Sequence, residues 1–134
     1  MANAKKFLAV WIRAVRPFSF TASVTPVLIG AAWASRSGYP VVWFLFPVFL
    51  FSALLLHAAT NLTSDYSDFK KGVDRADTFG SVRVLVRGEL KAEEIRKGAL
   101  ILFVVAFILG LAIVAVRGWG FLVLGLVGIA GGIF

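Results

Sequence analysis

The chain of 134 residues is 60% hydrophobic, carries a net charge of +7 and contains no cysteine, which excludes a disulfide framework and a thiolate metal site. Its mean hydropathy is +0.90, and its apolar runs of about 18 to 20 residues match the roughly 30 Å hydrocarbon core of a bilayer. These properties indicate an integral membrane protein. The weak alternation of a barrel strand is absent from the sequence, so we predict an all-α fold. Membrane topology accounts for the positive charge, and we expect no nucleic-acid partner.

The N-terminal segment 1–16 combines a short apolar patch with four basic side chains, Lys5, Lys6, Arg13 and Arg16. This pattern predicts an interfacial amphipathic helix that leads into a first span at about residues 18–35. Pro17 suits the start of that span, because a first-turn residue needs no backbone N–H. Small and hydroxyl residues recur on one face of the span and predict close packing against other helices, with a substrate cavity as the alternative.

The second span is predicted at residues 41–60. It is rich in aromatic residues, and Pro47 is expected to bend it by removing one helical hydrogen bond. His57 is the single histidine of the chain. We interpret it as a polar residue near the inner end of the span that finds a partner in the bundle, with a functional role as the alternative.

Two further spans are predicted at residues 98–116 and 119–134, which makes four transmembrane helices. In the last of them Gly128 and Gly132 form a G-x-x-x-G pair. Such a pair is more typical of ordinary close helix packing than of a dimer contact.

The distribution of Lys and Arg predicts the orientation of these spans. The N-terminal segment has four and residues 61–97 have eight, whereas the turns after the first and third spans have one each, Arg36 and Arg117. Positive charge concentrates on the cytoplasmic side of a membrane. We therefore expect a multi-pass protein of the cell inner membrane whose N-terminus and polar segment 61–97 face the cytoplasm.

The polar segment 61–97 is where the chemistry is expected, because it holds all seven acidic residues of the chain. Asp65 and Asp68 are three residues apart, so their carboxylates share a face if the second helix continues about two turns past residue 60. Asn61 would lie one turn earlier on the same side. Paired oxygen ligands suit Mg²⁺, which takes one or two protein carboxylates and completes its octahedron with water and phosphate oxygens.

The residues that follow add a turn, more acids and several cations. Gly72 permits a sharp change of direction, and Asp74 and Asp77 form a second acidic pair. Five cations are suited to hold a phosphate group: Lys70, Lys71, Arg75, Arg83 and Arg87. Acids for a metal and bases for a phosphate at the membrane surface predict a site for a lipid diphosphate. On composition alone, a solvated loop of mixed charge is an equal alternative.

The motif N-L-T-S-D-Y-S-D-F-K-K-G-V-D at residues 61–74 resembles the first aspartate-rich motif of the UbiA-type intramembrane prenyltransferases, in the form of their 1,4-dihydroxy-2-naphthoate branch. Residues 16–32 are similar to the start of these proteins, and residues 82–91 resemble their arginine-to-glycine stretch. The resemblance covers essentially the whole chain. Ser64 departs from it, since the family usually has Asn there, but Asn61 matches the pattern of the branch and can supply a metal ligand.

The resemblance implies roles for five further residues. Asp65 and Asp68 would hold Mg²⁺ against the diphosphate of a polyprenyl donor, with Asp74 as a further ligand. Lys71 and Arg83 would neutralise the leaving diphosphate. Proteins of this family have about nine helices and a second aspartate-rich motif in their later half. We therefore expect residues 1–134 to be the N-terminal part of a single membrane domain, the front of a nine-helix bundle.

The function implied is Mg²⁺-dependent transfer of a polyprenyl group to an aromatic acceptor in the membrane, most simply 1,4-dihydroxy-2-naphthoate in menaquinone biosynthesis. Within this class the alternative acceptors are 4-hydroxybenzoate and the haem and chlorophyll types. A small four-helix transporter fits the length, but such carriers need an ionisable residue within a span, and His57 is the single example here. A purely structural membrane subunit is the third alternative.

Overall fold

A computed structural model describes residues 2–72 and 84–133 of the chain. It contains the helices α1 (Ala2–Val15), α2 (Thr21–Arg36), α3 (Phe46–Lys70), α4 (Ala92–Arg117) and α5 (Gly120–Ile133), and two 3₁₀ turns, η1 (Pro17–Phe20) and η2 (Trp43–Leu45). The described residues form no strand. The predicted all-α fold is confirmed.

Three helical segments are long and apolar enough to cross a membrane: Pro17–Arg36, Trp43–Lys70 and Ala92–Arg117. They correspond to the first three predicted spans. The fourth corresponds to α5, an apolar helix of 14 residues, which is shorter than the three candidates. The structure is thus that of a helical membrane protein, with three full-length candidate spans and one shorter apolar helix among the described residues.

The start of α4 and the effect of Pro47 differ from what the sequence predicts. α4 begins at Ala92, six positions before the expected Gly98. Its start is capped by Glu94, whose carboxylate accepts a hydrogen bond of 2.7 Å from the backbone N–H of Lys91, and acidic residues in a first turn also favour the helix dipole. Pro47, expected to bend the second span, lies in the first turn of α3, where the helix loses no hydrogen bond.

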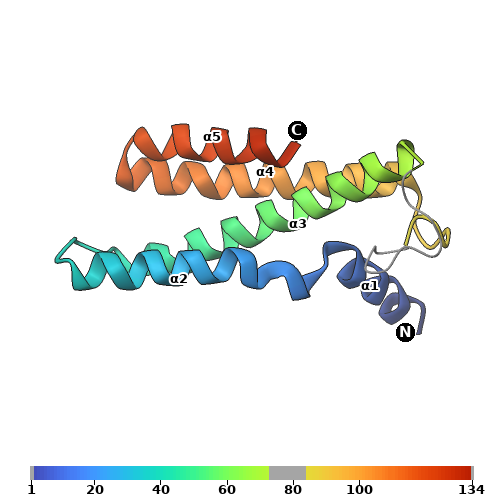
Figure 1. The fold of residues 1–134 in the computed structure, drawn as a ribbon, viewed down its shortest axis with the longest axis horizontal. Coiled ribbons are helices and arrows are strands. Elements are labelled where there is room, and N and C mark those ends of the chain that lie inside the picture. Colours follow the sequence, from blue (N-terminus) through green and yellow to red (C-terminus); the bar gives the residue numbers. More distant parts are fainter. Residues whose placement is uncertain (1, 73–83, 134) are drawn as a thin grey trace.

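α2, α3, α4 and α5 run roughly along one long axis, and α1 is inclined to it at one end of the molecule (Figure 1). α1, the C-terminal end of α3 and the start of α4 lie at one end of the molecule, and the turns after α2 and after α4 lie at the other. The described basic residues of the N-terminal and polar segments are therefore at the same end. We call this the polar end of the bundle.

A core cluster of buried residues ties α1 to the polar end. Val10 and Ala14 of α1 pack with Leu62 of α3 and Ile95 of α4, and the cluster also includes Val84, Leu85, Leu90 and Ala99. Three apolar side chains of α1, Phe7, Leu8 and Ile12, are exposed. The predicted amphipathic helix is thus present, and its buried face lies on protein. This packing fixes where the chain enters the first span.

Close approach of helices occurs at two glycines. A Cβ added to Gly98 in α4 would lie 2.6 Å from the Trp11 ring of α1, and one added to Gly132 in α5 would lie 2.5 Å from Oγ1 of Thr60 in α3. A Cβ at Gly128 would meet nothing within 4 Å. The predicted close packing through the G-x-x-x-G pair is therefore confirmed at Gly132 and does not involve Gly128.

Gly98→Ala is expected to destabilise the protein by about 1 to 3 kcal/mol, because the added methyl overlaps the Trp11 ring and overpacks the contact between α1 and α4. Gly110→Ala is the matched control in the same helix, since a Cβ there meets nothing within 4 Å, and alanine is the better helix former. Thermal unfolding in detergent measures both. Equal midpoints for the two variants would contradict the close contact.

Candidate functional site

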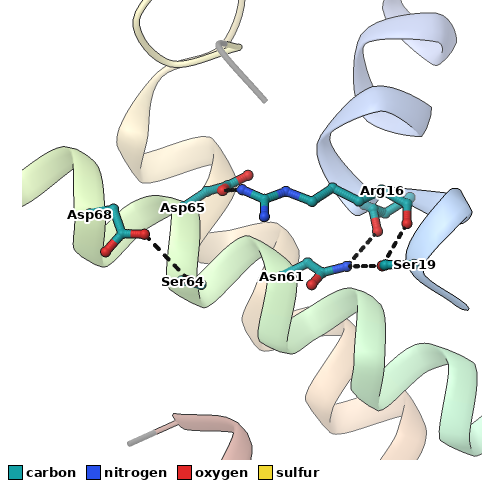
Figure 2. Close-up of polar contacts among 7 residues, drawn as sticks. Arg16, Ser19, Asn61, Ser64, Asp65 and Asp68 are labelled. Carbon is teal, nitrogen blue, oxygen red and sulfur yellow. Dashed lines mark hydrogen bonds and ion pairs between the residues drawn. The ribbon is translucent and has the colours of Figure 1, made fainter. Parts of the chain in front are cut away.

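Asn61, Asp65 and Asp68 lie on one side of the last turns of α3, at the polar end (Figure 2). Their alignment requires α3 to continue past residue 60, and the helix does so as far as Lys70. Asp65 is buried, with 5% of the residue exposed, whereas Asp68 is half-buried. The predicted pair of carboxylates on one helix face is therefore present, with one member inside the protein and one at its surface.

Asp65 is ion-paired with Arg16, which lies 49 positions earlier, between α1 and η1 (Figure 2). The exposed fractions of the two side chains are 22% for Arg16 and 7% for Asp65. Sequence reasoning assigned Arg16 to orientation and to the start of the first span, and missed this contact. The spacing of charges along one helix gives no signal for a pair between separate elements.

The backbone at Arg16 is left-handed, with φ 54° and ψ 63°. This conformation costs a non-glycine residue on the order of 1 kcal/mol and persists where neighbouring contacts hold it. The carbonyl of Arg16 accepts a hydrogen bond of 2.8 Å from the hydroxyl of Ser19. The next residue is Pro17, which disfavours the right-handed helical region at position 16. α1 therefore ends abruptly, and the Arg16 side chain reaches α3.

Asn61 stabilises the junction between α3 and residues 15–19, where α1 ends and η1 begins. Its amide nitrogen donates hydrogen bonds to the carbonyl of Val15 at 2.9 Å and to the hydroxyl of Ser19 at 3.1 Å (Figure 2). One of these bonds holds the residue before Arg16, and the other holds the residue three positions after it. The prediction that Asn61 binds the metal through its oxygen stays a prediction, and the structure adds a second role in fixing the backbone from which Arg16 extends.

His57 is held by two hydroxyls one turn before Asn61. Its Nε2 lies 2.9 Å from the Ser19 oxygen and its Nδ1 lies 2.7 Å from the Ser23 oxygen. The interpretation of His57 as a polar residue with a partner in the bundle is confirmed. Because Ser19 also accepts from Asn61, the polar contacts between η1, α2 and α3 form one continuous network.

Asp68 lies one turn beyond Asp65. Its carboxylate accepts a long hydrogen bond of 3.5 Å from the Ser64 hydroxyl. Lys70, the last residue of α3, lies over the Tyr66 ring, 5.3 Å from its centroid. Lys71 is exposed at the end of α3. Both cations thus lie in the part of the chain that directly follows the carboxylate pair.

The chain turns away from α3 at Gly72, whose φ is +66°. Its N–H donates to the carbonyl of Phe69 at 3.2 Å, as is typical of a glycine that ends a helix. The predicted change of direction at Gly72 is confirmed. The predicted site residues Asp74 and Arg83 lie outside the described residues, as do Asp77 and Arg75.

The donor set at the polar end fits a hard divalent cation. Among the described residues no group of three or more His, Cys, Asp or Glu side chains gathers, so a closed protein cage is not formed by this part of the chain. Mg²⁺ does not require one, because it binds through one or two carboxylates and keeps its remaining positions for water and phosphate oxygens. Asp65 and Asp68 supply that number of carboxylates.

The chain is similar to several known proteins. A family model described as the UbiA prenyltransferase family matches residues 23–134. The chain is 40% identical over 115 residues to 1,4-dihydroxy-2-naphthoate octaprenyltransferase of Bacillus subtilis (strain 168), which covers 86% of this chain and 37% of that protein. It is 32% identical over 123 residues to the Escherichia coli (strain K12) protein of the same name, which covers 86% of this chain and 39% of that one.

A vertebrate relative is also similar. UbiA prenyltransferase domain-containing protein 1 of Xenopus tropicalis is 36% identical over 99 residues, covering 74% of this chain and 28% of that protein. The chain therefore spans between 28% and 39% of the length of these three relatives. No solved structure matches the chain.

Proposed function

The chain belongs to the UbiA prenyltransferase family, and from this premise we propose that the protein transfers a prenyl group from a polyprenyl diphosphate to an aromatic acceptor within the membrane. The observation that carries the proposal is the pair Asp65 and Asp68, one turn apart at the polar end of a membrane helix. A solvated loop, the alternative on composition, would not bury one of these acids at 5% exposure. Family membership also favours the enzyme over the carrier and the structural subunit.

Asp65 and Asp68 are the residues that would hold Mg²⁺, with Asn61 and Asp74 as further ligands. Bound there, the ion would supply positive charge against the diphosphate. Lys71 and Arg83 add cations that neutralise the same group as it leaves. At the polar end of α3, Asp65 and Asp68 would bind the charged part of the donor and leave its isoprenoid tail to apolar side chains.

An apolar pocket that is partly open at the surface offers room for apolar groups. A cavity of about 220 Å³ lies between α3, α4 and α5 and is lined almost entirely by apolar side chains, among them Phe49, Leu56, Phe107, Leu111, Leu122 and Leu126. An isoprenoid chain is chemically matched to such walls.

The reaction we propose is an electrophilic aromatic substitution. The allylic C–O bond breaks with its electron pair going to the diphosphate, and the allylic carbon forms a C–C bond to the electron-rich ring. With 1,4-dihydroxy-2-naphthoate as acceptor, the ring carboxyl leaves as carbon dioxide and returns its electron pair to the ring, which gives the demethylmenaquinone skeleton. The names of the two bacterial relatives favour this acceptor over 4-hydroxybenzoate and over haem-type and chlorophyll-type acceptors.

A transfer assay with two acceptors tests this proposal. Purified protein in lipid nanodiscs is given Mg²⁺, a polyprenyl diphosphate and either 1,4-dihydroxy-2-naphthoate or 4-hydroxybenzoate, and products are identified by mass. The expected result is a prenylated naphthalene that has lost the carboxyl, with equimolar diphosphate released. Prenylation of 4-hydroxybenzoate alone would move the assignment to another branch, and no transfer with any aromatic acceptor would remove it.

We also propose that the polar end faces the cytoplasm and that the protein lies in the cell inner membrane. A cysteine replacing Ser37, after α2, is expected to react with a membrane-impermeant thiol reagent added to intact cells. A cysteine replacing Glu93, at the start of α4, is expected to react only after the cells are opened. The sequence contains no cysteine that would give background labelling. The reverse pattern would overturn the orientation.

A further inference from the structure

The ion pair between Arg16 and Asp65 lies on the carboxylate that the proposed function assigns to the metal. Both charges are largely removed from water, with 22% and 7% of the side chains exposed. A buried ion pair contributes little net stability, because desolvation offsets the attraction, and apolar residues often serve the fold as well. Stability alone therefore gives no reason for a cation at this position.

The Arg16 side chain also retains hydrogen-bonding capacity. Its Nε is buried and has no hydrogen-bond partner among the described residues. A guanidinium carries five N–H donors in a rigid fork that matches carboxylate and phosphate oxygens. The terminal nitrogen bound to Asp65 uses only part of this set. The group is thus able to accommodate a further anion beside the carboxylate.

Hydrogen bonds hold the backbone on either side of the Arg16 side chain, whereas the side chain itself changes position by rotation about its own bonds. Asn61 bonds the residue before it, at the Val15 carbonyl, and Ser19 bonds the carbonyl of Arg16 itself. The long side chain starts from a fixed point beside the acids on α3. A change of partner by the guanidinium therefore requires only side-chain rotation.

We propose that Arg16 holds Asp65 in the absence of ligands and binds the diphosphate of the donor once Asp65 binds the metal. This inference rests on the proposed function and adds to it a diphosphate-binding residue from outside the aspartate-rich segment. Arg16 and a divalent cation repel each other when both lie against one carboxylate. The diphosphate removes this conflict, because it gives the guanidinium a new anionic partner. Metal and diphosphate are therefore expected to bind cooperatively.

The test measures metal and diphosphate binding without turnover. Mn²⁺ affinity is measured by electron paramagnetic resonance on the purified protein in nanodiscs, with and without inorganic pyrophosphate, for the wild type and Arg16→Gln. The variant is expected to bind Mn²⁺ alone several-fold more tightly, because the competing cation is gone. Its affinity for pyrophosphate at saturating Mn²⁺ should fall about tenfold, so the coupling between the two ligands is lost.

Arg13→Gln is the matched control. Arg13 lies in α1 and pairs with Glu89, but 52% of its side chain is exposed and it does not contact the acids of α3 through any bond described. Its removal is expected to leave both affinities unchanged. Arg16→Lys keeps the positive charge but lacks the planar guanidinium, and it preserves the fold around residue 16 if Arg16→Gln does not. We expect Arg16→Lys to bind pyrophosphate more weakly than the wild type. Its affinity for Mn²⁺ alone should stay near that of the wild type.

In Arg16→Gln we expect the affinity for Mn²⁺ to rise and the affinity for pyrophosphate to fall. The loss of a purely structural arginine would not change the two affinities in opposite directions. If both affinities fall together in Arg16→Gln and Arg16→Lys, Arg16 serves the fold of the site and the inference is wrong. If neither affinity changes, Arg16 takes no part in ligand binding. A wild-type protein that binds neither Mn²⁺ nor pyrophosphate would instead overturn the proposed function, and this inference with it.

Discussion

Asp65→Asn and Asp68→Asn are each expected to lower the rate of prenyl transfer by several orders of magnitude. An amide keeps the size of the side chain but removes the negative charge, so it cannot balance a divalent cation against the diphosphate. The rate is measured as product formed per purified protein in nanodiscs at saturating Mg²⁺. Near-normal turnover in both variants would show that these carboxylates do not form the site.

The two variants differ in what they do to the fold. Asp65→Asn leaves the half-buried Arg16 without its ionised partner, and a charge that is partly removed from water and uncompensated is destabilising. Asp68 accepts only a long hydrogen bond from Ser64 among the bonds described, so Asp68→Asn is expected to fold like the wild type and is the cleaner test. Glu93→Gln is the control, because this acid is exposed at the start of α4 and pairs with Arg96 on the same helix. It should keep full activity.

Asn61→Asp and Asn61→Leu are both expected to lower transfer by about 10- to 100-fold, as is typical when a residue that orients a ligand is lost. Neither side chain can donate to the Val15 carbonyl and the Ser19 hydroxyl, which Asn61 bonds at 2.9 and 3.1 Å. The junction that positions Arg16 would loosen. Both variants should also unfold at lower temperature, because the Val15 carbonyl loses its donor.

The aspartate variant separates the two roles considered for Asn61. A carboxylate is a better Mg²⁺ ligand than an amide, so Asn61→Asp would retain or improve metal-dependent activity if the residue served only through its oxygen. Thr63→Val is the control on the same helix, since the Thr63 hydroxyl bonds only to the backbone of its own helix at Ala59 among the bonds described. Full activity in Asn61→Asp would refute the role of the amide nitrogen.

Much of the architecture could be predicted because it depends on local pattern. Apolar length predicted the spans, and the three-residue spacing of Asp65 and Asp68 placed them on one face once α3 continued past residue 60. Gly72 marked the end of that helix by its capacity for positive φ. α4 begins six residues before the predicted third span, because Glu93 and Glu94 in a first turn favour the helix.

The parts that could not be predicted depend on contacts between distant segments. The sequence pattern shows that α1 has an apolar face, but either lipid or protein can cover such a face. The packing of Val10 and Ala14 in the core cluster shows that protein covers it. The pairing of Arg16 with Asp65 spans 49 positions. It depends on how α1 ends and on how α1 packs against α3, and the spacing of charges along the sequence predicts neither.

The central claim is that the acids at the polar end of α3 bind the diphosphate of a prenyl donor through a divalent cation. Equilibrium binding of a radiolabelled prenyl diphosphate to the purified protein in nanodiscs tests it most directly, with Mg²⁺, with a chelator, and with Mg²⁺ restored. Saturable binding should appear with Mg²⁺, disappear with the chelator and return on restoration, and Asp68→Asn should show none of it. Equal binding in chelator and in Mg²⁺, or unchanged Mg²⁺-dependent binding by Asp68→Asn, would contradict the account.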